Sequence, residues 1–257
     1  ISIFAEAMSD FETKAKYERF AKAYEFYFDK STRFMRGLDS KGEWRTPFNP
    51  RASTHRSDDY CEGTAWQWTW FVPHDVDGLV NLMGGEDAFV QKLDSLFTVD
   101  SSLEGEMISS DISGLIGQYA HGNEPSHHVI HLYNYVNRPW RTQELVDSVY
   151  QSQYANSTDG LSGNEDCGQM SAWYILNSMG FYQVCPGKPI YSIGRPAFDK
   201  AVINLPEEKT FSIVVKNNEK KNKYIESVTL NGQPLNTPFF HHQAVSYTHL
   251  RAHETDQ

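Results

Sequence analysis

The stretch Gly163-Asn164-Glu165-Asp166-Cys167-Gly168-Gln169-Met170-Ser171-Ala172-Trp173 is the part of this chain around which the rest can be arranged. It is a glycine-bearing loop with two adjacent carboxylates, and the apolar run 173–176 follows it. Carboxylates at a helix start interact favourably with the unpaired N–H groups and with the positive end of the helix dipole. The pattern therefore predicts a helix from this loop to about Ser178, ended by Gly180.

The chain on the N-terminal side of this loop has a helical pattern, because apolar residues recur there at roughly helical spacing. Pro125 and Pro139 stand where proline fits the first turn of a helix. No strand is predicted between residues 10 and 180. The predicted helices cover about 10–36, 60–73, 76–83, 86–97, 125–137 and 139–154, with a break at Gly84-Gly85.

The pattern changes after Gly187. The segments 201–203, 211–215 and 224–230 are rich in β-branched and aromatic residues, and Asn231-Gly232 is a typical hairpin turn. These features predict a small antiparallel sheet packed on the helical part.

Both ends of the chain look unusual. The chain begins without an initiator Met or a basic leader, so we expect a piece that starts within a longer protein. The segment 245–255 fits neither pattern and resembles a translated sequencing adapter. We therefore expect residues 244–257 to be a non-native tail, and the sheet to lack its final strand.

Composition narrows the classes of function. The 257 residues carry a formal net charge of −10, which disfavours a nucleic-acid backbone as partner. No apolar run approaches the length of a membrane span. The three cysteines, Cys61, Cys167 and Cys185, show neither a CxxC pair nor a zinc spacing. The oligomeric state cannot be read from the sequence.

Three short segments place acidic and polar residues at predicted helix ends: Glu62, Asn123-Glu124 and Asn164-Glu165-Asp166. Loops at one end of successive helices converge, so these segments could line one cavity. Glycoside hydrolysis needs such a set, with one carboxylic acid to protonate the leaving oxygen and one carboxylate to activate water. By spacing alone this is a weak signal, because any acidic protein of this size offers several such sets.

The surroundings suggest which carboxyl group plays which role. Glu62 lies among Trp66, Trp68 and Trp70, and apolar surroundings raise the pKa of a carboxyl group towards the value that a general acid needs. Asp166, at a helix start, would stay ionised and suit the base. Most of the tryptophans are expected in the core, with one or two facing a ligand.

The histidines of the 127–131 segment leave two alternatives open. His127 and His131 share a helix face, as the ligands of HExxH zinc enzymes do, but His128 stands where those enzymes have Glu. The alternative, which we favour, is that these histidines hydrogen-bond locally or line a polar cavity. Calcium suits the oxygen donors of this chain better than zinc does.

Several segments, taken together, resemble glycoside hydrolase family 92, a family of exo-acting α-mannosidases. The resemblance covers about residues 1–243 in the family's order. The matching segments are Glu62–Asp75, His121–His128, Tyr133–Tyr135, Gly163–Trp173, Gly180–Gly187 and Tyr191–Pro196.

The resemblance implies a mainly α fold, a partial (α/α)6 toroid followed by a small antiparallel β-sheet. Residues 1–187 would be part of the catalytic toroid, and residues 188–243 would be the β-sheet region packed on it. Family members are far longer and carry a β-sandwich on the N-terminal side of the toroid. We therefore expect this chain to be the C-terminal part of such an enzyme.

The activity implied by the resemblance is removal of terminal α-linked mannose from glycans, with inversion at the anomeric carbon. Glu62 matches the family's general acid and Asp166 its general base. Asn164 stands where some members have an Asp that assists the base. Sugar contacts are expected from Trp66, His121, Asn164 and Gln169.

The resemblance also implies calcium, which binds the mannose 2- and 3-hydroxyls, and we expect Asn123, Glu124 and Glu165 around it. The partner would be a mannose-containing glycan, and the setting secreted, periplasmic or at the cell surface of a bacterium.

Two alternatives stay open. The first is a non-catalytic carbohydrate-binding remnant, because a toroid builds its sugar pocket from all of its helix pairs and part of them is missing here. The second is an (α/α)6 glycosidase or phosphorylase of other specificity. A phosphorylase needs a phosphate-binding cluster where the base sits, and Gly163–Asp166 offers an acid instead.

Overall fold

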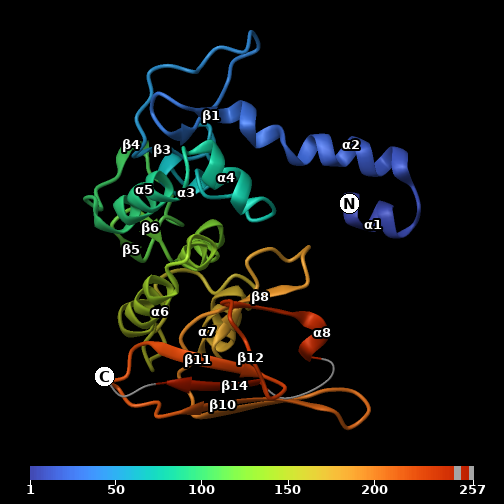
Figure 1. Ribbon diagram of the computed structural model, residues 1–257. Helices are drawn as coiled ribbons and strands as arrows, with labels where there is room; N and C mark the ends of the chain where they lie inside the picture. Colours follow the sequence, from blue (N-terminus) through green and yellow to red (C-terminus); the bar gives the residue numbers. More distant parts are fainter. Residues whose placement is uncertain (246–249, 255–257) are drawn as a thin grey trace.

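The computed structural model describes residues 1–245 and 250–254. In Figure 1 two short helices extend from one side of a helical body, and a β layer covers the opposite end of that body. The α-helices are α1 (Ser2–Ala7), α2 (Phe11–Ala21), α3 (Ala65–Trp68), α4 (Val76–Leu82), α5 (Glu86–Thr98), α6 (Pro139–Gln153), α7 (Gln169–Ser178) and α8 (His242–Val245), and the 3-10 helices are η1 (Ala23–Tyr27), η2 (Glu124–Ser126) and η3 (Val129–Val136).

The strands form a five-stranded sheet, a three-stranded sheet and three short two-stranded pairs. They are β1 (Phe28–Asp29), β2 (Phe34–Met35), β3 (Ala52–Thr54), β4 (Glu104–Met107), β5 (Leu115–Ile116), β6 (Tyr119–Ala120), β7 (Phe181–Tyr182), β8 (Ile190–Ile193), β9 (Lys200–Asn204), β10 (Thr210–Lys216), β11 (Ile225–Leu230), β12 (Gln233–Pro234), β13 (Phe239–His241) and β14 (Leu250–Glu254).

The most regular helices follow the sequence pattern. α5 starts with two acids in its first turn and buries Phe89, Leu93 and Leu96, which share one helix face. Positive φ angles at Gly84 and Gly85 separate it from α4, as predicted. The predictions for α6 and α7 are confirmed within a few residues, although the loop before α7 extends to Gly168.

The predicted helix over 10–36 is wrong beyond Ala21. The chain continues through η1 into the hairpin of β1 and β2. Asp29 explains the hairpin, because its carboxylate accepts hydrogen bonds from Ser31 and Thr32 and pairs with buried Arg36. Such local side-chain bonds compete with a helix.

Other predictions also need correction. The aromatic helix expected over 60–73 is only the four residues of α3, and the helix expected over 125–137 is the pair of 3-10 helices η2 and η3. Six strands, β1 to β6, precede residue 180, although none was predicted there. They are two to four residues long, too short to show an alternating pattern. A mainly α class is therefore not confirmed, because the sheets are substantial.

The expected β-rich segments form β9, β10 and β11, and Asn231-Gly232 turns between β11 and β12 with both φ angles positive. In the five-stranded sheet the pairing is antiparallel except between β10 and β14. The predicted division at 187/188 falls between β7 and β8, which pair with each other, and the division into two regions stays a prediction.

The expected non-native tail lies partly outside the described residues. Within them, β14 is hydrogen-bonded between β10 and β11, in the place of a central strand. Strand pairing does not by itself distinguish a native segment from an added one, so the tail stays a prediction.

Two hydrophobic clusters hold the chain together. The larger one joins α3 to α7 and includes Trp70, Phe89 and Trp173. The smaller one, around Phe211 and Phe240, lies beneath the sheets, and Leu176 of α7 packs against both. In the part of the chain that the structure describes, no helix has the length and apolar character needed to cross a bilayer.

Candidate active site

Glu62 lies in the loop that leads into α3, and its side chain is exposed. Its backbone is in the left-handed region, with φ 49°, a conformation that costs a residue with a Cβ atom roughly 1–2 kcal/mol. Two side chains hold this loop. The Nδ2 of Asn123 donates to the Glu62 carbonyl at 2.8 Å, and the Nε1 of Trp68 donates to the Cys61 carbonyl at 2.7 Å.

The tryptophans near Glu62 in sequence do not all lie around it. Trp66 and Trp70 are buried in the larger cluster, where Trp66 packs edge-on against Phe34 and Trp70 against Phe89. The exposed carboxyl group of Glu62 is therefore not enclosed by the three tryptophans, and Trp66 is a core residue, so the sugar contact expected from it stays a prediction.

Asp166 lies in the turn that leads into α7, and it is exposed. Asp166, Cys167 and Gly168 are all left-handed, with φ 52°, 56° and 99°. Glu165 stabilises this turn, because its carboxylate accepts the backbone N–H of Gly168 and, at 3.1 Å, that of Ser171. Hydrogen bonding by the Ser171 side chain, together with these backbone hydrogen bonds, lowers the pKa of Glu165.

The acid-bearing loops predicted from the sequence meet in the structure. Gly122 and Gly163 lie so close that a Cβ on Gly163 would be 2.7 Å from the Gly122 carbonyl oxygen. Gly122 in turn donates its N–H to the carbonyl of Ser113 at 3.0 Å. The side chain of Asn164 donates to Asp111 at 3.3 Å, so a fourth loop, around Asp111, joins the site.

The electrostatic surroundings of Asp166 raise the pKa of its carboxyl group. Loss of water around the carboxyl group is the largest cause, followed by the negative charges of Glu124, Asp111 and Glu165, while His127 acts in the opposite direction. A base with a raised pKa binds a proton from water more strongly, although it loses its charge sooner as the pH falls.

His121 lies beneath this surface and is fully buried. Tyr154 donates its hydroxyl to the Met170 carbonyl and therefore accepts from His121 Nε2, and Tyr119 donates to His121 Nδ1. Both ring nitrogens are used, and burial lowers the pKa of His121 to about 2, so the ring is neutral. His121 thus supports the loop from below, and the sugar contact expected from it stays a prediction.

Gln169 and His127 form a second supporting layer. His127 donates Nε2–H to the His121 carbonyl at 2.9 Å, and its Nδ1 accepts from the Gln169 side chain at 3.0 Å. Gln169 also lies 3.3 Å from the Tyr182 hydroxyl. Burial lowers the pKa of His127 to about 4, so it too is neutral.

The zinc alternative is not supported. His131 donates to the Asn177 side chain at 2.8 Å and accepts from Ser192, and His128 donates to the Trp70 carbonyl. Among residues 1–245 and 250–254, no three His, Cys, Asp or Glu side chains are grouped so that they could hold a metal ion. The alternative of local hydrogen bonding is therefore confirmed for these histidines.

The donors expected for calcium fit only in part. The Oδ1 of Asn123 accepts the Glu124 N–H, and both carboxylate oxygens of Glu165 accept backbone N–H groups. Glu124 and Asp166 remain as carboxylates that influence each other electrostatically. These residues alone do not make a calcium site, so no step of the reaction is assigned to the ion.

Asp111 is the residue that sequence reasoning missed. It stands in a loop that looked merely acidic and rich in serine, and only the contact with Asn164 brings it to the site. Ser109 donates its hydroxyl to the other oxygen of Asp111 at 2.9 Å.

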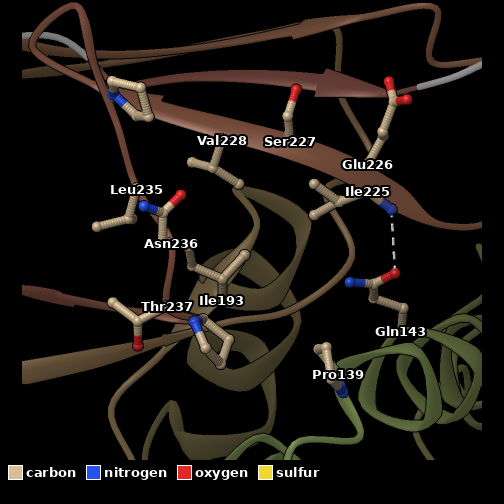
Figure 2. A pocket seen from close by; sticks show the side chains of 12 residues that line it. Pro139, Gln143, Ile193, Ile225, Glu226, Ser227, Val228, Leu235, Asn236 and Thr237 are labelled. Carbon is tan, nitrogen blue, oxygen red and sulfur yellow. Dashed lines mark hydrogen bonds between the residues drawn. The ribbon is translucent and has the colours of Figure 1, made fainter.

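A cavity of about 380 Å³ lies elsewhere, between the start of α6 and β11. Figure 2 shows its mainly apolar lining, with Ile193, Val228 and Leu235, and the hydrogen bond between Gln143 and the Ile225 N–H. None of the predicted site residues lines it. It is a gap between the helical part and the β layer.

Comparisons with known proteins show which family the chain is similar to. The sequence model described as "Glycosyl hydrolase family 92 catalytic domain" matches residues 1–252. The chain superposes with TM-score 0.91 and 37% identity on the family GH92 α-mannosidase BT3965 from Bacteroides thetaiotaomicron in complex with mannoimidazole, covering 98% of this chain and 34% of that one. It superposes with TM-score 0.85 and 35% identity on the family GH92 inverting mannosidase BT2199 from the same organism, covering 98% and 35%.

A curated relative, an uncharacterized secreted glycosidase of Arthroderma benhamiae, is 32% identical over 193 residues, which is 74% of this chain and 23% of the relative. The chain thus spans about a third or less of the length of these relatives. The matching residues include every loop of the site just described. The chain belongs to glycosyl hydrolase family 92.

Proposed function

We propose that this chain is part of the catalytic domain of an exo-acting α-mannosidase that removes terminal α-linked mannose from glycans with inversion. Two solved neighbours are described as α-mannosidase and inverting mannosidase, which supports the substrate class and the stereochemistry. One relative is described as secreted, and we extend an extracytoplasmic location to this protein. We also propose that α3 to α7 form part of an (α/α)6 toroid.

The observation that carries the proposal is the way in which the two acid loops are held. Glu62 and Asp166 are both left-handed, and each is fixed by a neighbouring polar side chain, Asn123 for Glu62 and Glu165 for the Asp166 turn. Strained backbone that is held by polar side chains is typical of functional sites. Asn123 and Glu124 also connect the two loops, because Asn123 binds Glu62 and the charge of Glu124 acts on Asp166.

In the proposed mechanism Glu62 starts protonated and donates its proton to the glycosidic oxygen as the bond to the leaving sugar breaks. Asp166 takes a proton from water, and the oxygen of this water attacks the anomeric carbon from the opposite face. The mannose is released with inverted configuration, the leaving sugar carries the proton of Glu62, and Asp166 holds the proton of the water. Proton exchange with solvent restores both groups.

Inversion can be tested directly. Proton NMR of the first product formed from an α-mannoside should show β-mannose before mutarotation, and α-mannose as first product would contradict the mechanism. Glu62→Gln and Asp166→Asn should each lower kcat about 10²- to 10⁴-fold, the usual contribution of a general acid or base. Near-normal turnover by either variant would refute its assignment.

Calcium dependence is a further part of the proposal, with the carboxylate of Glu124, which acts electrostatically on Asp166, as the donor that this chain would offer to an ion. When bound, the ion would polarise the sugar hydroxyls. Activity that a chelator leaves unchanged would contradict this part alone.

The second candidate is a non-catalytic carbohydrate-binding protein. The chain spans only about a third of the length of the solved α-mannosidases, so part of the residues that form their sugar pocket has no counterpart here, which supports this candidate. Binding of mannosides by the folded chain without release of mannose would favour it. Release of a sugar other than mannose would instead indicate another glycosidase specificity.

A further inference from the structure

Ser113 lies where three loops of the candidate site meet. It belongs to the loop around Asp111, and its carbonyl accepts the N–H of Gly122. Its hydroxyl oxygen lies against two glycines, because a Cβ atom on Gly122 would overlap it and one on Gly163 would be 2.8 Å from it. The Ser113 side chain is therefore packed against the loop of Gly122 and against the loop that leads to Asp166.

Close approach, and not backbone conformation, explains the two glycines. Neither Gly122 nor Gly163 has a positive φ angle, so other residues could adopt the same backbone conformation. A Cβ atom at either position would instead meet the Ser113 hydroxyl, and on Gly163 it would also meet the Gly122 carbonyl oxygen at 2.7 Å. The glycines let the three loops pack around the Ser113 side chain.

A second serine makes the reciprocal contact. A Cβ atom on Gly114, the residue after Ser113, would be 2.5 Å from the hydroxyl oxygen of Ser162. The hydrogen bond from Asn164 to Asp111 at 3.3 Å lies next to these contacts. Residue numbers in these pairs rise along one loop while they fall along the other, so the two loops run side by side in opposite directions.

Hydrogen bonding does not explain a serine at position 113. The hydroxyl oxygen is buried, and within residues 1–245 and 250–254 the structure gives it no hydrogen-bond partner. A buried polar group without a partner is unfavourable for folding, and departures of this kind are expected mainly at functional sites. The contribution of Ser113 is therefore steric, through the room that its side chain fills between the loops.

We propose that Ser113 is a positioning residue of the site, whose side chain sets the separation between the loops that carry Asp111, Glu124 and Asp166. This inference rests on the proposed function and adds a residue to it. Ser113 does not touch the reacting atoms. It acts through the place at which Asp166 is held, and a small change in that separation should affect the reaction more than the binding of substrate.

Gly122→Ala is the first test, because the new methyl group would need the room of the Ser113 hydroxyl and would force the loops apart. We expect kcat for α-mannobiose to fall about 10- to 100-fold, since a displacement of about 1 Å is enough for such a loss. KM should change little, because the affected step follows binding. Gly187→Ala is the matched control: Gly187 also lacks a positive φ, is exposed, and has 4.0 Å between a Cβ and the nearest atom.

Rescue by a second substitution separates positioning from general damage. In Ser113→Ala/Gly122→Ala the methyl group of residue 122 takes the room that the hydroxyl has left, so kcat should recover to within about threefold of Ser113→Ala. Equal losses in Gly122→Ala and in the double variant would overturn the proposal. Circular dichroism and thermal unfolding show which variants are folded. Should Gly122→Ala fail to fold, a double variant that also fails to fold would overturn the proposal, and recovered folding would support it.

NMR gives a readout that does not depend on activity. The backbone amide signals of Asp166 and Gly168 should shift in Gly122→Ala, return towards their wild-type positions in the double variant, and stay in place in Gly187→Ala. Unshifted signals in folded Gly122→Ala would overturn the positioning role and leave the hydrolase intact. Shift and return of these signals, without hydrolysis of α-mannobiose by the wild-type chain, would retain the positioning role and refute the catalytic function.

Discussion

Asn123 donates its side-chain amide to the backbone carbonyl of Glu62 at 2.8 Å, and this single bond ties the loop before α3 to the loop before η2. The same side chain accepts the Glu124 N–H through Oδ1. Asn123 was predicted as a calcium ligand. In the structure its side-chain nitrogen and its side-chain oxygen each hydrogen-bond to the protein backbone.

Asn123→Asp keeps the acceptor for the Glu124 N–H and removes the donor to Glu62. We expect kcat for α-mannobiose to fall roughly two- to tenfold, the worth of one hydrogen bond, because Glu62 is less well placed to protonate the leaving oxygen. Turnover of α-mannosyl fluoride, which needs little help from an acid, should change less. Asn156→Asp, at an exposed position, controls for the added charge. Equal losses of turnover on both substrates in Asn123→Asp would argue against a positioning role of Asn123.

Asp111→Asn tests the electrostatics of the proposed base. The negative charge of Asp111 helps to raise the pKa of Asp166, so its removal should lower that pKa. The acidic limb of the pH profile of kcat/KM should then move to lower pH. Asp159→Asn, in an exposed loop, should leave the limb in place. A shift towards higher pH in Asp111→Asn would contradict the assignment of Asp166.

Lys92 gives a prediction on stability. Its ammonium group lies 3.3 Å from the centre of the Phe34 ring and 4.3 Å from that of Trp66, and the side chain is buried. Burial, with a smaller effect of Arg33, lowers the pKa of Lys92 to about 7. The unfolded chain therefore holds this proton more tightly than the folded chain, and the free energy of unfolding should rise as the pH rises from about 7 towards 10.5.

Lys92→Met should remove this rise and should be more stable than the wild type at pH 7 and below. Urea unfolding of both proteins between pH 6 and pH 10 measures the difference. Lys41→Met, at an exposed position, is the control. If the free energy of unfolding of the wild type changed with pH in the same way as that of Lys92→Met, the burial argument would be refuted.

Asp29 and Arg36 form a buried ion pair at 2.7 Å at the β1–β2 hairpin. Burial raises the pKa of Asp29, but the hydrogen bonds from Ser31 and Arg36 outweigh it, and the net pKa is well below the ordinary value. The stabilisation is thus present above about pH 4 and is lost as the pH falls through the pKa of the folded state.

Asp29→Asn leaves Arg36 buried without its counter-ion and should cost about 3–5 kcal/mol in the free energy of unfolding at pH 7. The difference from wild type should shrink in acid, where the wild-type carboxyl group also takes up a proton. Asp77→Asn, in α4, is the comparison for a less buried acid. A loss below 1 kcal/mol would contradict a structural role for the pair.

The sequence by itself determined the elements whose signals are local. Gly84-Gly85 divides α4 from α5, Pro139 starts α6, and Asn231-Gly232 turns a hairpin, because backbone conformations of glycine, proline and asparagine depend little on distant contacts. The acid-bearing strings and the family resemblance also came from the sequence alone.

The tertiary structure decided what depends on distant partners. Asp29 turns a predicted helix into a hairpin through Arg36, His121 and Trp66 lie in the interior, and Asp111 reaches the site through Asn164. A side chain's burial and hydrogen-bond partners are set by residues that lie tens of positions away in sequence. The local spacing of apolar residues does not predict these distant contacts.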